Sequence, residues 1–257
     1  MLIPSEIELL QQSKKEMAER YYVQAILARA QTAVGSWAHW EAINQQLENS
    51  QARDALSWFE LAGSAGIGTI RMAHARDALL GAYRLTDPID KEDRLTICQL
   101  AQWLENKDTA ERLGSSDWAI DQGHNSWVVE AAAARNTERI QRLKSLVPSN
   151  WATGSPTNTE LLTLRKILRP QRNHLAHALH GELQDLPSLD EFRRFLTLTL
   201  ELATDAAFIW MGSTASAQAV EENARKQAQS FWKHAFAGPI REWNTAMVQR
   251  RAAEIEP

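Results

Sequence analysis

The segment ILRPQRNHLAHALHGEL, residues 167–183, gathers the side chains of this chain that are best suited to chemistry. It holds two arginines, one asparagine and three histidines in a pattern that otherwise predicts a helix, and it contains Pro170. A proline costs about 3 kcal/mol inside a helix but little at the first helical position. We therefore expect the helix that starts near Thr159 to bend or restart at about Arg169.

The angles between these residues limit what they can do together. Asn173 and His177 are four residues apart and share a helix face. Arg172 and His177 are five apart, which places them about 140° apart around an ideal helix. Their side chains converge only if the backbone is distorted, if Arg172 reaches around the helix, or if a partner protomer completes the site.

The three histidines also allow two simpler interpretations. His174, His177 and His180 could supply imidazole ligands to a metal ion. Successive steps of three residues rotate by about 60°, however, so the outer two side chains diverge, and no nearby cysteine or carboxylate completes the set. The other interpretation is structural, with half-exposed histidines hydrogen-bonded to their neighbours.

Two stretches together resemble a known family. RNHLAH, residues 172–177, has the form R-x4-H with an asparagine directly after the arginine, and it resembles the motif of the HEPN superfamily of all-α domains. Residues 76–105 resemble the part of AbiU2-like HEPN proteins in which a helix ends in an R-L-x-D loop before a short leucine-rich helix. Here that loop contains Arg84, Leu85 and Asp87.

The resemblance covers about residues 5–211 and leaves the segment after Gly212 unexplained. Arg169 and His174 stand in the same R-x4-H spacing, and Asn173 beside Arg172 favours the later register. We therefore expect an HEPN-like antiparallel helical bundle over residues 1–212, with additional helices and a long C-terminal helical extension over residues 213–257.

The resemblance implies cleavage of RNA by a homodimer that juxtaposes two motifs, without a metal or another cofactor. His177 would act as general base or acid, since the ordinary pKa of a histidine side chain lies near neutrality. Arg172 would stabilise charge that develops on the phosphate. Asn173 would orient the imidazole or hold a phosphate oxygen. The remaining candidates, for substrate binding or support, are His174, Arg84, Asp87 and Arg169. For Arg84 and Asp87 the alternative is a structural ion pair or a loop cap.

Three functions follow as alternatives. The first is an HEPN ribonuclease of the toxin or anti-phage defence type, whose partners would be RNA, a second copy and an antitoxin or other defence protein. The second is a non-catalytic HEPN module that dimerises and binds a protein or nucleic acid. The third is a metal-dependent hydrolase. The intact R-N-x3-H motif favours the enzyme, whereas the formal charge of −4 favours the binding module.

Helical signals dominate the whole chain, and strand signals are nearly absent. Loops are expected at 84–94 and 147–159, and the capping pairs Thr157–Glu160 and Ser188–Glu191 begin two of the helices. The predicted helices cover about residues 5–47, 53–83, 95–105, 126–146, 159 onward, 188–211 and 216–254, the last interrupted at AGPI (237–240).

The composition limits the environment and the ligands. The 28 basic and 32 acidic residues argue against a dedicated DNA-binding module. Cys98 is the single cysteine, flanked by apolar residues, and predicts a buried structural thiol in a reducing compartment. No long apolar run occurs, so we expect a cytoplasmic protein without a membrane partner. GSAGIG (63–68) predicts close helix packing, and TERIQRLK (137–144) a solvated or phosphate-tracking helix face.

Overall fold

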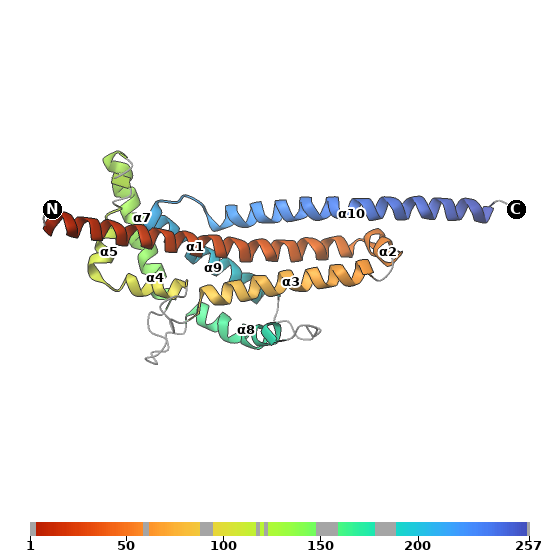
Figure 1. The fold of residues 1–257 in the computed structure, drawn as a ribbon, viewed down its shortest axis with the longest axis horizontal. Helices are drawn as coiled ribbons and strands as arrows, with labels where there is room; N and C mark the ends of the chain where they lie inside the picture. Colours follow the sequence, from red (N-terminus) through yellow and green to blue (C-terminus); the bar gives the residue numbers. More distant parts are fainter. Residues whose placement is uncertain are drawn as a thin grey trace. The chain divides into compact units, whose positions relative to one another are not determined.

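A computed structural model describes residues 4–58, 62–87, 95–116, 119–120, 123–147, 159–177 and 189–255 (Figure 1). Every secondary-structure element in these ranges is helical, so the predicted all-α class is confirmed. The helices are α1 (Pro4–Glu48), α2 (Ser50–Trp58), α3 (Ala62–Leu85), α4 (Ile97–Trp103), α5 (Lys107–Gly114), α7 (Ser126–Leu146), α8 (Glu160–His177), α9 (Leu189–Met211) and α10 (Ala217–Ile255).

Most helix bounds follow the sequence pattern, and three features differ from it. The single helix predicted over 53–83 corresponds to α2 and α3. Helix α5 was not predicted, and it is capped by Asn106, whose Oδ1 accepts a hydrogen bond from the Thr109 N–H at 3.0 Å. Helix α8 is capped by Thr159, whose Oγ1 accepts from the Leu162 N–H at 3.3 Å. The predicted cap Thr157 and the predicted cap Ser188 lie outside the described residues.

Two prolines that were expected to interrupt helices lie inside them. Pro170 is within α8 and Pro239 is within α10, so the predicted restart at Pro170 and break at AGPI are wrong, whereas a bend at Pro170 stays a prediction. Proline cannot donate to the carbonyl four residues earlier. Those residues, Lys166 and Ala235, are exposed, so water can replace the missing donor. The helices therefore tolerate both prolines.

The chain divides into two compact units. Unit 1 contains Met1–Thr32 and Leu79–Ala217, and unit 2 contains Ala33–Ala78 and Gln218–Pro257. This division places residues 33–78 with the C-terminal segment, whereas the sequence suggested a single boundary at Gly212. Helices α1 and α3 each contribute residues to both units.

Unit 1 is organised around α9, which packs against α4, α5, α7 and α8. The successive residues Leu198, Thr199 and Leu200 are all buried, as expected for a helix that is covered on several sides. The carboxylate of Glu19 in α1 is also buried, and its Oε2 accepts from Arg112 at 2.7 Å and from the Trp210 indole at 3.1 Å. These bonds link α1, α5 and α9.

Cys98 lies in the interior of unit 1, as predicted. Its side chain is fully buried in α4, and its Sγ lies 3.7 Å from the carbonyl oxygen of Thr86. A buried thiol in apolar surroundings is chemically inert, so its role is packing.

Unit 2 has an apolar core of its own. The core residues are Ala38, Ala42, Ile43, Ala52, Leu56, Ala228, Trp232 and Phe236, from α1, α2 and α10. The Trp232 Nε1 donates to His39 Nδ1 at 3.0 Å, and the His74 ring stacks on His39 with centroids 5.0 Å apart. Burial lowers the pKa of both histidines, and for His74 the charge of His39 lowers it further.

The GSAGIG segment lies within α3, but the expected close packing is wrong at two of its glycines. A Cβ added to Gly66 or Gly68 would meet no described atom within 4 Å. Separately, none of the described helices combines the length and the apolarity needed to cross a membrane.

Candidate functional site

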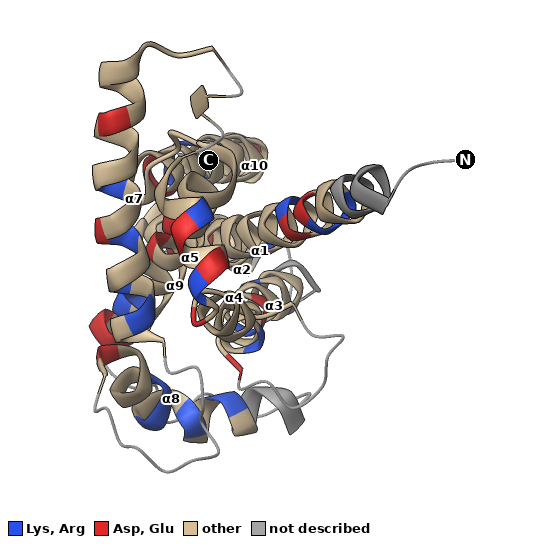
Figure 2. Cartoon of the chain, turned by 90° about the vertical axis from the view of Figure 1, so that its left-hand side faces the viewer, with Lys and Arg blue, Asp and Glu red and all other residues tan. Residues whose placement is uncertain are grey.

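A cavity of about 950 Å³ in unit 1 lies beside α8. Its described lining combines four cationic side chains with one carboxylate, two aliphatic residues, a threonine and a tyrosine. The cations are Arg165, Lys166, Arg169 and Arg172, and the other lining residues are Tyr83, Asp87, Leu162, Thr163 and Ile167. Figure 2 shows the succession of basic positions along α8. The cavity is therefore suited to an anion.

Helix α8 presents these cations to the cavity because its buried leucines and its basic residues lie on different faces. Leu161, Leu164 and Leu168 recur at intervals of three and four and are buried on the side that packs against α9. Arg165 and Arg169 are four residues apart, and Arg172 follows three later, so the three share another face of the helix. Burial of the leucine face thus turns the arginines toward the cavity.

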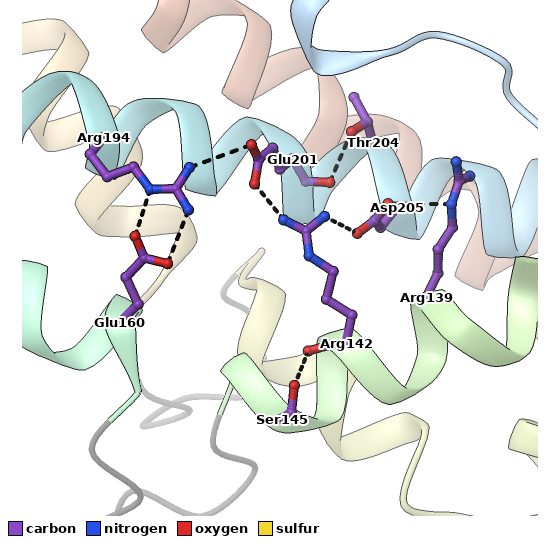
Figure 3. Close-up of polar contacts among 8 residues, drawn as sticks. All are labelled: Arg139, Arg142, Ser145, Glu160, Arg194, Glu201, Thr204 and Asp205. Carbon is purple, nitrogen blue, oxygen red and sulfur yellow. Dashed lines mark hydrogen bonds and ion pairs between the residues drawn. The ribbon is translucent and has the colours of Figure 1, made fainter.

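The beginning of α8 is fixed to α9 by a forked ion pair (Figure 3). The Arg194 Nε and Nη2 donate to the two carboxylate oxygens of Glu160 at 2.5 and 3.0 Å. These bonds lower the pKa of Glu160. Arg194 Nη1 also lies 3.5 Å from Glu201 on α9, which connects the pair to a longer network.

That network neutralises the basic face predicted on α7. Arg142 donates to Glu201 and, at 2.8 Å, to Asp205, while Arg139 lies 3.4 Å from Asp205 (Figure 3). The Arg139 guanidinium also lies 3.8 Å from the centroid of the Phe208 ring. Burial raises the pKa of Asp205, although both arginines act to lower it. These two arginines join α7 to α9, so TERIQRLK is not a solvated or phosphate-tracking face at 139 and 142.

Arg165 forms the wall of the cavity between α8 and the end of α3. Its guanidinium donates to the Tyr83 carbonyl at 2.9 Å, to Thr86 Oγ1 at 2.5 Å and to Asp87 Oδ1 at 2.8 Å. It also lies 4.5 Å from the centroid of the Tyr83 ring, and the Tyr83 hydroxyl donates to the Arg165 carbonyl. The role of Arg165 could not be predicted from the sequence, because its partners lie about eighty residues earlier in the chain.

The pKa of the Tyr83 hydroxyl depends on its burial and on the arginines that line the cavity. Burial raises its pKa to about 12, and the positive charges of Arg165, Arg172 and Arg169 act in the opposite direction. The phenol is therefore protonated at neutral pH and acts as a hydrogen-bond donor. Arg165, Arg169 and Arg172 line the same cavity as Tyr83.

The structure brings several of the predicted site residues together. Arg172 is half-buried and lines the cavity with Arg169 and with Asp87, whose described ion-pair partner is Arg165. The Arg172 Nη1 donates to Asn173 Oδ1 at 3.0 Å, so the amide is placed with the arginine. Arg84 is exposed on the last turn of α3 and is not among the lining residues.

The histidines are positioned only by their backbone. His174 and His177 belong to the last turn of α8, and their side chains, like all of His180, lie outside the described residues. Because α8 is continuous, positions 172 and 177 are about 140° apart around its axis. A restart at Pro170 therefore does not bring them together. The two remaining routes are the long reach of Arg172 and a residue from a second protomer.

Comparison of the chain with protein-family models, curated proteins and solved structures found no match. Within the described residues, no group of three or more histidine, cysteine, aspartate and glutamate side chains is placed to hold a metal ion.

Proposed function

We propose that this chain is a metal-independent endoribonuclease of the HEPN toxin or anti-phage defence type. One observation carries the proposal. Arg172, the first residue of the R-N-x3-H sequence, lines a cavity that also contains Arg165, Lys166 and Arg169. A row of cations beside a histidine-containing motif suits the cleavage of a phosphodiester, because the reaction needs both charge stabilisation and proton transfer.

The reaction uses a nucleophile that RNA itself provides. The 2′-oxygen attacks the adjacent phosphorus, the bond to the 5′-oxygen breaks, and the products are a 2′,3′-cyclic phosphate and a 5′-hydroxyl. His177 removes the proton from the 2′-hydroxyl or delivers one to the leaving oxygen. Arg172 offers a permanent, forked charge to the phosphate oxygens. Asn173 holds the arginine in place through the 3.0 Å hydrogen bond.

The helical geometry favours a site that is shared by two copies. Positions 172 and 177 of one continuous helix lie about 140° apart around its axis, so a single α8 does not easily present both residues to one phosphate. Two copies related by a two-fold axis would place Arg172 of one protomer opposite His177 of the other. We therefore propose a homodimer in which the two α8 segments border one cleft.

The test compares RNA cleavage by the purified wild-type chain with cleavage by Arg172→Ala and His177→Ala, with and without EDTA. Lys144→Ala is the matched control, since Lys144 is an exposed cation of α7. We expect cleavage that is insensitive to EDTA and lost in both site variants. Circular dichroism establishes that the variants are folded. Intact RNA with the wild-type chain, or full activity of His177→Ala, would contradict the proposal.

The formal charge of −4 favours a second candidate, a non-catalytic HEPN module that binds a protein or nucleic acid. Expression in cells separates the two. A ribonuclease of the toxin type arrests growth in a manner that depends on His177, whereas a binding module is harmless and retains its partner when His177 is replaced. Cleavage that EDTA abolishes would instead favour a metal-dependent hydrolase.

A further inference from the structure

Lys166 and Arg169 are two cations of the α8 cavity that the proposed reaction does not use. We propose that they bind the phosphates next to the cleaved one, so that the strand lies along α8 and is held at several successive phosphates. This inference rests on the proposed function for the identity of the ligand as RNA. It adds a binding site on the side of Arg172 that faces the start of the helix.

The spacing along α8 supports this arrangement. Lys166, Arg169 and Arg172 are separated by three residues each, and each step rises about 4.5 Å and turns about 60°. From Lys166 to Arg172 the positions therefore rise about 9 Å and wind about 120° around the helix, and all three side chains line the same cavity. A nucleic-acid strand carries one charge about every 3.4 Å along a stacked helix, so a rise of this length spans more than one phosphate.

The charge balance distinguishes these cations from Arg165. Arg165 is largely shielded, with 13% of its side chain exposed, and it is paired with Asp87. Lys166 and Arg169 are exposed and line the same cavity. A ligand can reach these two, whereas Arg165 is bound to the wall. Four cations and one carboxylate leave the cavity with a formal charge of +3.

The size of the cavity argues for an extended ligand. Its volume of about 950 Å³ lies at the upper end of the range of roughly 300–1,000 Å³ for small-molecule sites. Ile167, with 38% of its surface exposed, and Leu162 add apolar area beside the cations. A single inorganic phosphate would leave most of this space empty, whereas linked nucleotides offer both phosphates and apolar sugar and base surfaces.

The test measures binding of a labelled 2′-O-methyl RNA of about 12 nucleotides to the full-length chain. Because this RNA lacks the 2′-hydroxyl nucleophile, binding is observed without cleavage. The variant is Lys166→Ala with Arg169→Ala. The matched control is Arg225→Ala with Lys226→Ala, which removes the same two charges from exposed positions of α10. The dissociation constant is measured over a range of salt concentrations.

Each phosphate contact with a single strand contributes about 0.7 to the slope of log affinity against log salt. Loss of two contacts should reduce the magnitude of that slope by about 1.4. If the affinities of the variant and the wild type are equal at 1 M salt, the variant should bind roughly 25-fold more weakly at 0.1 M salt. The control should keep the wild-type slope. An unchanged slope in the site variant, an equal loss in the control, or no RNA binding by the wild-type chain would overturn the inference.

The same experiment separates this inference from the ribonuclease proposal. If the wild-type chain leaves natural RNA intact but the site variant loses slope, the phosphate-binding site stands and the catalytic proposal fails. If natural RNA is cleaved in a His177-dependent manner and the slope does not change, the catalytic proposal stands and the phosphate-binding site fails. In an active enzyme, the site variant should raise KM more than it lowers kcat.

Discussion

Replacement of Arg165 by methionine should destabilise unit 1 strongly while leaving its apolar packing in place. Methionine keeps most of the length of the arginine stem, so the change removes the guanidinium alone. The guanidinium holds the end of α3 against α8 through Asp87, Thr86 and the Tyr83 carbonyl. After substitution Asp87 keeps its charge but loses the partner that neutralises it.

The magnitude follows from the shielding of the pair. The exposed fractions of the two side chains are 13% for Arg165 and 17% for Asp87, so the value of 0–1 kcal/mol typical of surface pairs does not apply. Loss of one partner of a buried pair costs about 3–5 kcal/mol. Partial access of water to Asp87 places our expectation at the lower end, about 3 kcal/mol. For a domain of this size, that corresponds to a fall in Tm of about 6–12 °C.

The assay is urea unfolding at pH 7, followed by circular dichroism, for the wild type, Arg165→Met, Asp87→Asn and the double variant. The control is Lys166→Met, whose side chain is exposed and whose effect should stay within about 0.5 kcal/mol. Because Arg165 and Asp87 contact each other, their effects should not add, and we expect a coupling energy of about 1.5–3 kcal/mol. A loss below 1 kcal/mol for Arg165→Met, or simple additivity, would refute the reasoning.

Two further predictions concern unit 2 and the glycines. The pKa values of His39 and His74 are lowered in the folded state, so the unfolded state binds more protons as the pH falls. The contribution of the two neutral histidines to the free energy of unfolding is therefore present above about pH 6.5 and is lost as the pH falls through the folded-state pKa values. Unfolding free energies measured between pH 8 and 5 should therefore fall less in the double variant His39→Gln with His74→Gln, and equal slopes would contradict this assignment. Gly66→Ala should raise stability by about 0.5–1 kcal/mol, because the site is helical and open, whereas Gly123→Ala should lower it, because Gly123 has a φ of +71°. Thermal unfolding measures both, and a lower Tm for Gly66→Ala would indicate that another surface covers that site.

The helical architecture could be predicted from the sequence because it depends on local periodicity. The bounds of α7 and α9 follow directly from the spacing of apolar residues and from nearby loops. The effects of Pro170 and Pro239 could not be predicted in the same way, because the cost of a proline depends on whether water reaches the carbonyl that it leaves unpaired. Exposure at Lys166 and Ala235 is a property of the folded chain.

Ion pairs between residues far apart in the chain cannot be predicted from the local sequence pattern. Arg139 and Arg142 occur in a segment that resembles an ordinary charged helix face, and their carboxylate partners on α9 come about sixty residues later. Arg165 has no motif to mark it, whereas Arg172 was identified by its neighbours Asn173 and His177. The sequence drew attention to residues 167–183, which do not include Arg165, and only the fold showed that Arg165 serves the cavity wall.

The position of Cys98 allows local opening at the cavity wall to be measured by thiol labelling. Its thiol contacts the Thr86 carbonyl, and the Thr86 hydroxyl accepts a hydrogen bond from Arg165. Since Cys98 is fully buried and is the single cysteine, a thiol-reactive dye can label the protein only when this region opens. The labelling rate therefore reads out the local opening of the segment that borders the cavity, without any engineered probe.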